Sequence, residues 1–415
     1  MTPFELIAIL MTITALAGWV NVKTFHVPHG VAMLIAGLVG ASLLFGLQWV
    51  DPAFSIGLLI SHLVDRIDFG PTVTGYMLAF LLFAGAMQVD LTEMRRHWLA
   101  IGALATLGVA GSIVIAGFGL WLVANRLGLP LPLSWAMVFG ALISPTDPVA
   151  VLATVKQGRL SSILKVVLQG EALFNDGVGI VAFSALAALA AGGAQVSPLQ
   201  VVADIVVESL GGLLFGMAAG WLVIRLMGTL DDFAVEVSMT IALAMGTFAA
   251  AQAMHLSGAI AVVGAGVLFG GPRARTAMAG QTEIYLTAFW TLVDEILNAL
   301  LFLLLGVEIV AVPFYAHQTG LLIAAIPIVL IARFAVVLPW GSYFRFRHAE
   351  RRPTVILGWG GLHGALSLAL ALSLPATPQR AMILAVTYVV VAFSITVQGL
   401  TFPSLVRSIQ RRESA

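Results

Sequence analysis

Apolar stretches of membrane-spanning length follow one another along almost the whole chain. A helix needs about 20 mainly apolar residues to cross a bilayer. The hydrophobic residues run on within each stretch instead of alternating, which favours helices over the strands of a barrel. The pattern predicts an all-α polytopic membrane protein with 13 transmembrane helices, near residues 4–21, 28–48, 71–89, 98–125, 132–155, 163–192, 198–224, 233–253, 256–271, 285–310, 318–343, 353–375 and 379–405.

The composition supports a membrane protein and excludes several other classes. Of the 415 residues, 60% are hydrophobic and 10% are charged, whereas a soluble domain carries roughly 25% charged residues. The absence of cysteine excludes disulfides and thiolate metal sites. The formal net charge is zero, which gives no reason to expect nucleic-acid binding. No motif suggests a cofactor.

Positive charges are distributed unevenly between the predicted loops. If the N-terminus lies outside and the chain crosses thirteen times, the inner loops and tail hold sixteen of the 20 lysines and arginines. The outer loops hold Arg66, Arg126 and Arg380, and Arg333 lies within a span. Inner loops of membrane proteins carry the excess of positive charge. We therefore expect a cell-membrane protein with its N-terminus outside and its C-terminus in the cytoplasm.

Two of the predicted helices are interrupted. Pro145 and Pro148 stand in the fifth stretch, and proline removes a backbone donor and clashes with the preceding turn. The twelfth contains Gly360, Gly361 and Gly364, which permit unwinding at little steric cost. If spans 1–6 and 8–13 are inverted repeats, these two discontinuous helices are counterparts, and such paired interruptions indicate a transporter's binding site. Ordinary proline and glycine kinks are the alternative.

Three carboxylates fall in otherwise apolar spans, namely Asp147, Glu171 and Asp176. A charge at the bilayer centre costs ~2.5–3.5 kcal/mol even on lenient scales, so such residues face an interior or a wet cavity. Asn175 is four residues after Glu171 and shares its helix face. Asp176 lies about 140° round from Glu171. The two acids are therefore expected to have different partners and different roles.

Asp176 can hold a proton or a hard monovalent cation, but not readily both, and this competition is sufficient for exchange. If it alone carries both ions, one cation replaces one proton and the cycle is electroneutral. A second aspartate in place of Asn175 could add a second proton. Thr146 offers oxygen ligands that suit a hard cation such as sodium. Asp147 either binds the ion directly or orients Asn175.

Three motifs, in the right order, resemble one family of transporters. They are Ser144 to Val151, Gly170 to Gly177 with its Asn-Asp pair, and Gly360 to Ala365. With Asn298 and Gly306, they resemble the monovalent cation–proton antiporters, in the sodium/proton exchanger branch with the Asn-Asp signature (bacterial NhaP-type). The likeness covers nearly the whole chain.

The resemblance implies thirteen helices in inverted six-helix repeats, with the discontinuous helices of spans 5 and 12 crossed in a core part, and usually a homodimer. It implies elevator-like movement of a core part, mainly spans 4–6 and 11–13 (98–192 and 318–405), against a dimerisation part formed by the remaining spans. The family's ion-binding aspartate falls on Asp176, its asparagine on Asn175 and its buried glutamate on Glu171.

The chain departs from the family in three places. Ala172 stands where a serine commonly follows the glutamate, so water or Thr146 would supply the missing oxygen. The third span lacks the acidic residue of some relatives. His363 stands where the family usually has an arginine that pairs with the glutamate. Because histidine titrates near neutrality, we expect a pH-dependent pair of Glu171 and His363; otherwise His363 simply hydrogen-bonds within a packed core.

Arg333 is the only basic residue deep in a predicted span, so it needs an anionic partner or backbone acceptors. Asp294 and Glu295 in the tenth span are the expected partners, in a structural salt bridge. A role of Arg333 in transport is the alternative.

These features favour a secondary active transporter that exchanges Na⁺, or else Li⁺ or K⁺, for H⁺ across the membrane. The alternative is a proton-coupled symporter of a small solute, although spans 5, 6 and 12 offer few polar side chains for an organic substrate. An intramembrane aspartyl protease would need a Gly-x-Gly-Asp element, which the sequence lacks, so we do not expect an enzyme.

Overall fold

The computed structural model describes residues 3–50, 75, 77–147, 160–192, 198–278, 280–308, 312 and 314–411. Within these ranges every regular element is a helix. Eight helical stretches of the described residues are long and apolar enough to cross a membrane, and four shorter apolar helices accompany them. The prediction of a helical polytopic membrane protein is confirmed, while thirteen crossings and the inverted repeats remain predictions.

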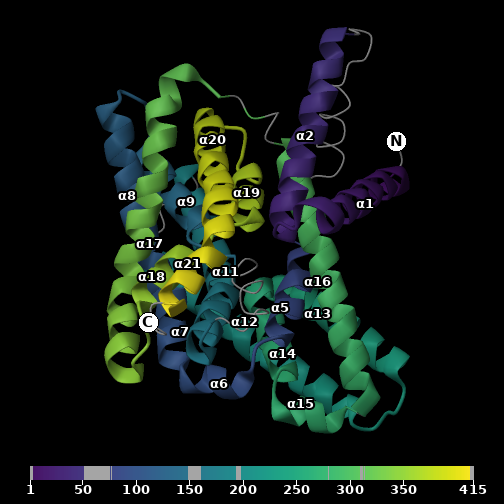
Figure 1. Ribbon diagram of the computed structural model, residues 1–415. Coiled ribbons are helices and arrows are strands. Elements are labelled where there is room, and N and C mark those ends of the chain that lie inside the picture. Colours follow the sequence, from purple (N-terminus) through teal and green to yellow (C-terminus); the bar gives the residue numbers. More distant parts are fainter. Residues whose placement is uncertain are drawn as a thin grey trace.

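Each predicted span overlaps a described helix or consecutive helices (Figure 1), although parts of the spans 71–89 and 132–155 lie outside the described residues. The helices are α1 (Pro3–Val20), α2 (His29–Val50), α5 (Leu78–Met87), α6 (Leu91–Arg96), α7 (Trp98–Ala103), α8 (Val109–Arg126), α9 (Leu133–Ile143), α11 (Ser162–Ala190), α12 (Pro198–Met227), α13 (Phe233–Ala253), α14 (Gly258–Phe269), α15 (Pro272–Ala277), α16 (Gly280–Glu308), α17 (Thr319–His348), α18 (Pro353–Gly360), α19 (Ala365–Leu372), α20 (Pro378–Phe393) and α21 (Gly399–Arg411). Three π-helical turns, η1 (Asn21–Phe25), η3 (Leu104–Gly108) and η6 (Ser394–Gln398), and the 3₁₀ turn η5 (Ala316–Gln318) complete them.

Polar side chains mark where several helices begin. Asp90, Ser161, Asp232 and Ser257 precede α6, α11, α13 and α14, and each accepts a hydrogen bond from a backbone N–H of the first turn. Such a cap satisfies donors that the helix itself leaves free and contributes ~1 kcal/mol. The first helix turns therefore follow from local sequence even where the helix is otherwise uniformly apolar.

Helix packing divides the described chain into two sets of neighbours (Figure 1). In the first, the α16 group, α16 packs along α2, α5 and α13, and α14 packs against α5, α12 and α13. In the second, the α17 group, α17 packs against α8, α18 and α20, α8 packs against α9, and α19 packs against α20. Helix α11 contacts both groups, through α9 on one side and α12 and α14 on the other.

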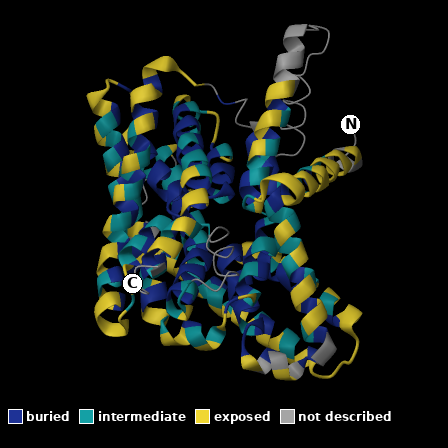
Figure 2. Cartoon of the chain, viewed as in Figure 1, coloured by how far each residue is buried: buried dark blue, intermediate teal, exposed yellow. Residues whose placement is uncertain are grey.

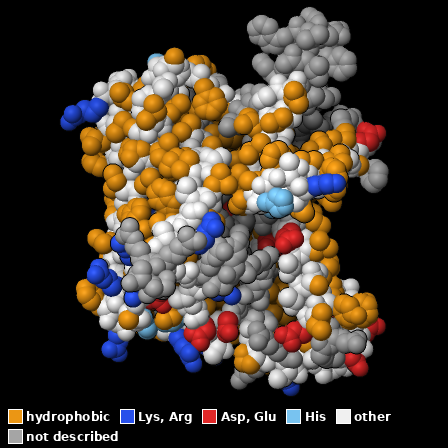
Figure 3. All heavy atoms as spheres, viewed as in Figure 1, with side chains coloured by type: hydrophobic (Ala, Val, Ile, Leu, Met, Phe, Trp, Pro, Cys, Tyr) orange, Lys and Arg blue, Asp and Glu red, His pale blue; other side chains and the backbone are white. Residues whose placement is uncertain are grey.

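Large hydrophobic side chains cover the outer surface. Leu107, Leu214 and Ile331 are 74%, 66% and 63% exposed, although each lies in the middle of a long helix. Figure 2 marks exposed residues along the outer helices, and Figure 3 shows hydrophobic side chains over much of the upper part of the visible face. Apolar surface on this scale is expected where a helix faces lipid.

Candidate functional site

The fifth and twelfth predicted spans touch where each is interrupted. Helix α9 ends at Ile143, and α18 ends at Gly360, five residues before α19 begins at Ala365. The backbone N–H of Asp147 donates a 2.6 Å hydrogen bond to the carbonyl of Leu362, which makes an isolated antiparallel bridge between the two breaks. Pro145 lies in the first break, and Pro148 lies outside the described residues.

The glycines of the second break allow close approach of other groups. Gly361 and Gly364 have φ angles of −77° and −111°, which other residues adopt freely. A β-carbon on Gly364 would lie 2.7 Å from the β-carbon of Asp147, and one on Gly361 would overlap the guanidinium of Arg333. Both glycines are therefore required by their neighbours and not by an unusual backbone conformation.

Asn175 holds the first break against α11. Its Nδ2 donates a 2.8 Å hydrogen bond to Oγ1 of Thr146, and the backbone N–H of Thr146 donates to its Oδ1 over 3.4 Å. Asn175 and Thr146 are both buried, at 1% and 5% exposure. The amide thus satisfies two polar groups that the interrupted helix leaves without helical partners.

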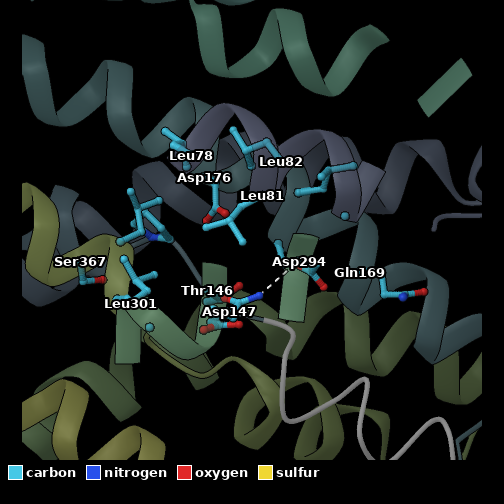
Figure 4. Close-up of a pocket in the computed structure, with 18 of the residues that line it drawn as sticks. Leu78, Leu81, Leu82, Thr146, Asp147, Gln169, Asp176, Asp294, Leu301 and Ser367 are labelled. Carbon is cyan, nitrogen blue, oxygen red and sulfur yellow. Dashed lines mark hydrogen bonds between the residues drawn. The ribbon is translucent and has the colours of Figure 1, made fainter. Parts of the chain in front are cut away.

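Asp176, Asp147 and Thr146 line one cavity, together with Pro145 and Gly364 (Figure 4). The α16 group contributes further polar side chains to its wall, namely Asp294, Asn298 and Gln88. Asp147 lies near enough to Asp176 and to Asp294 for its charge to act on both. The cavity therefore combines carboxylates, hydroxyls and amides from several spans in an otherwise apolar surrounding.

Arg333 pairs with Glu171, so the prediction that it pairs with Glu295 or Asp294 is wrong. Its Nη1 and Nη2 donate to the two carboxylate oxygens of Glu171, the second over 2.9 Å. Its Nε and Nη2 also donate to the carbonyl of Leu357, over 3.3 and 3.0 Å. The reason is packing: α17 lies against α18 and α8, whereas α16 belongs to the other group of helices.

His363 does not pair with Glu171, and that prediction is also wrong. Nδ1 of His363 lies 3.2 Å from the carbonyl oxygen of Pro145, and because a carbonyl can only accept, Nδ1 carries the proton. The backbone N–H of His363 donates to Oγ of Ser394 over 2.8 Å. The buried imidazole therefore joins the two breaks through its hydrogen bond to Pro145, which is the alternative considered from the sequence.

Several polar residues of the site were not predicted from the sequence. Gln88, Gln169 and Ser367 line the cavity. Oγ of Ser394 donates to Oε1 of Gln398 over 2.7 Å, and Nε2 of Gln398 donates to the carbonyl of Trp359 over 3.3 Å, so η6 supports the second break. Each is an isolated polar residue in an apolar span, and Ser394 and Gln398 are four residues apart on one helix face; these signals could have identified them.

Known proteins share both the sequence pattern and the fold. The family described as "Sodium/hydrogen exchanger, transmembrane" matches residues 10–408. The Na(+)/H(+) antiporter NhaP of Pseudomonas aeruginosa is 37% identical over 411 residues, covering 98% of this chain and 96% of the relative. The Na(+)/H(+) antiporter NhaH of Halobacillus aidingensis is 32% identical over 410 residues, covering 97% and 96%.

A solved structure is similar over nearly the full length. The sodium proton antiporter MjNhaP1 from Methanocaldococcus jannaschii superimposes with a TM-score of 0.72 at 18% sequence identity, covering 98% of this chain and 99% of the other. At this identity the likeness concerns the fold alone.

Proposed function

The chain belongs to the sodium/hydrogen exchanger family, and from this premise we propose that it exchanges Na⁺ for H⁺ across the cell membrane as a secondary active transporter. The observation that carries the proposal is Asp176 in a cavity beside the touching helix breaks. Curated relatives are named antiporters, which favours exchange over the symport considered from the sequence.

In the proposed cycle Asp176 holds either the cation or the proton. A bare carboxylate is costly away from water, whereas a carboxylate neutralised by either ion is not. Translocation is therefore favourable only when the site is loaded. Thr146 offers further oxygen ligands for the cation, and Asn175 keeps Thr146 in place through the hydrogen bonds described above.

The surroundings of Asp176 support an electroneutral exchange of one cation for one proton. Asn175 is a neutral amide whose groups are already engaged with Thr146. The charge of Glu171 is balanced by Arg333. Neither neighbour on α11 is then left to carry a second proton, so the cation-loaded and proton-loaded sites have equal charge.

We infer that the core part, 98–192 and 318–405, moves as an elevator relative to the remaining spans. Support comes from the cavity, whose wall combines Asp294 of the α16 group with Ala365 and Ser367 of α19, in the α17 group. Movement of one group past the other would open this cavity to alternate sides of the membrane. The proposed assembly is a homodimer through the α16 group, with the N-terminus outside and the C-terminus in the cytoplasm.

Dequenching of a pH-sensitive dye in everted membrane vesicles tests the function. We expect a response to added Na⁺, with Li⁺ and K⁺ added separately to define selectivity. Asp176→Asn should abolish the response, while Asp204→Asn, at an exposed aspartate on α12, should leave it unchanged. A normal response of the Asp176→Asn variant would refute the proposed role of Asp176.

The stoichiometry has its own test in proteoliposomes with an imposed membrane potential. An electroneutral exchange proceeds at the same rate with and without the potential. A rate that follows the potential would contradict the one-to-one exchange and leave antiport itself intact.

A further inference from the structure

Asp294 remains without a role in the exchange described above. It lies in the middle of α16, partly buried, and lines the same cavity as Asp176. Nδ2 of Asn298, one turn later, donates a 2.9 Å hydrogen bond to Oδ1 of Asp294, and the side chain of Gln88, which follows α5, lies near this carboxylate on the same cavity wall. The amide of Asn298 thus holds this carboxylate at the cavity wall, where Figure 4 shows Asp294.

The same cavity wall contains polar oxygens that lack protein partners. Oε1 of Gln169 and Oγ of Ser367 have no hydrogen-bond partner among the described residues. The two side chains are 94% and 99% buried, as their exposures of 6% and 1% show. A buried polar group left unpaired costs ~1–3 kcal/mol. Because the carbonyl oxygen of Gln169 can only accept, its partner has to be a donor or a cation.

Asp147, Asp176 and Asp294 do not form one three-carboxylate metal site. In the described part of the chain no three acidic or histidine side chains lie close enough together to hold one metal ion. Asp147 acts electrostatically on both Asp176 and Asp294, and all three carboxylates line one cavity. Asp294 is carried by the α16 group, which the elevator proposal leaves in place.

We propose that Asp294 is a second cation-binding carboxylate, which holds the transported monovalent cation in the cavity at a position separate from Asp176. This inference rests on the proposed exchange function. Carboxylate oxygens are ligands that a hard cation prefers, and Asp294 shares its cavity with the polar side chains of Gln88, Gln169 and Asn298. A fixed negative charge there raises the local concentration of the cation. Asp176 still performs the exchange.

The test measures the dependence of transport on Na⁺ and Li⁺ concentration in everted vesicles. In Asp294→Asn the KM for both ions should rise ~10-fold, while the maximal rate stays within about twofold, because local concentration changes and the exchanging carboxylate does not. Asp294→Glu should restore the KM to within about threefold, because it returns the charge. Glu295→Gln is the matched control, since it removes the adjacent, exposed carboxylate, and its KM should equal that of the wild type. Gln169→Leu should also raise the KM.

Several outcomes would overturn the inference. An unchanged KM in Asp294→Asn means that Asp294 binds no cation. Equal loss of transport in Asp294→Asn and Asp294→Glu, with both variants monodisperse in size-exclusion chromatography, means that the side chain is needed for translocation and not for binding. In both cases exchange by the wild type and its loss in Asp176→Asn would preserve the proposed function. Absence of exchange in the wild type would refute that function first.

Discussion

Arg333 on α17 and Glu171 on α11 form a buried ion pair, although the two residues are 162 positions apart in the sequence. Both guanidinium Nη atoms contact the carboxylate, and the side chains are only 6% and 2% exposed. The remaining donors of Arg333 reach the carbonyl of Leu357 near the end of α18. The pair therefore fastens α17, α11 and α18 together directly behind the helix breaks.

Removal of one partner should destabilise the protein strongly. In Arg333→Met, Glu171 becomes a buried carboxylate without a counter-charge, and such a loss typically costs ~3–5 kcal/mol. Unfolding in detergent, followed by the midpoint of thermal or denaturant transitions, measures the change. Replacement of both residues by apolar side chains of similar volume should recover much of the stability, because no charge is then left unpaired.

The exposed pair of Glu93 and Arg96 is the control for this measurement. Nη1 of Arg96 lies 2.7 Å from Oε1 of Glu93, and the two side chains are 68% and 30% exposed. Ion pairs in water contribute only ~0–1 kcal/mol, so Arg96→Ala should have a small effect. Similar unfolding of Arg333→Met and Arg96→Ala would show that the buried pair does not stabilise the fold.

The ion pair of Arg333 and Glu171 also shows what one sequence can and cannot predict about the site. Thr146, Asp147, Asn175 and Asp176 stood out because prolines and polar groups interrupt apolar segments, which is a local signal. The partner of Arg333 depends on which helices pack together, and the uniformly apolar spans give little information about that. The sequence offered Asp294 and Glu295 on the tenth span as partners for Arg333. These residues lie in α16, which belongs to the other group of helices.

More of the fold than of the site could be predicted from the sequence. Length and hydropathy located the apolar helices that the structure describes, because a bilayer imposes the same minimum length on each spanning helix. The short helix α9 ends just before the proline motif, and the glycine motif lies where α18 ends and α19 begins. What local sequence does not specify is contact between the breaks, which depends on the bridge from Asp147 to Leu362. Local sequence also does not show that Asp294 faces the cavity, because the packing of α16 determines which way its side chains point.

The hydrogen bonds between Thr146 and Asn175 predict that the threonine hydroxyl matters for transport. In Thr146→Val, Nδ2 of the buried Asn175 loses its acceptor, which costs ~1–3 kcal/mol, and one oxygen near Asp176 is lost. We expect a lower apparent affinity for Na⁺ in vesicles and a lower unfolding midpoint. Thr146→Ser keeps the hydroxyl and should resemble the wild type. If Thr146→Val and Thr146→Ser transport equally well, the hydroxyl is dispensable.

The close approach of Gly364 to Asp147 predicts a specific effect of a single methyl group. In Gly364→Ala the new β-carbon would lie 2.7 Å from the β-carbon of Asp147, so the aspartate or the backbone of the break has to move. We expect a marked loss of transport, measured at saturating Na⁺. Gly246→Ala on α13 meets no atom within 4 Å and should be neutral or stabilising by up to ~1 kcal/mol, because alanine favours helix. Wild-type transport by Gly364→Ala would show that the breaks tolerate this shift.

His97, between α6 and α7, predicts how stability depends on pH. Its ring centroid lies 5.4 Å from that of His348 at the end of α17. Burial lowers the pKa of His97 below the usual 6.5, the neighbouring His348 and Arg96 lower it further, and Glu93 opposes them. The unfolded chain therefore binds this proton more readily than the folded one. The contribution of His97 to the free energy of unfolding is fully present above pH 6.5 and is lost as the pH falls below that value.

The unfolding midpoint should therefore decrease between pH 8 and about pH 5.5, and His97→Gln should make this decrease smaller. His317→Gln, at an exposed histidine, should leave it unchanged. An identical decrease in His97→Gln and the wild type would mean that other groups control the acid sensitivity.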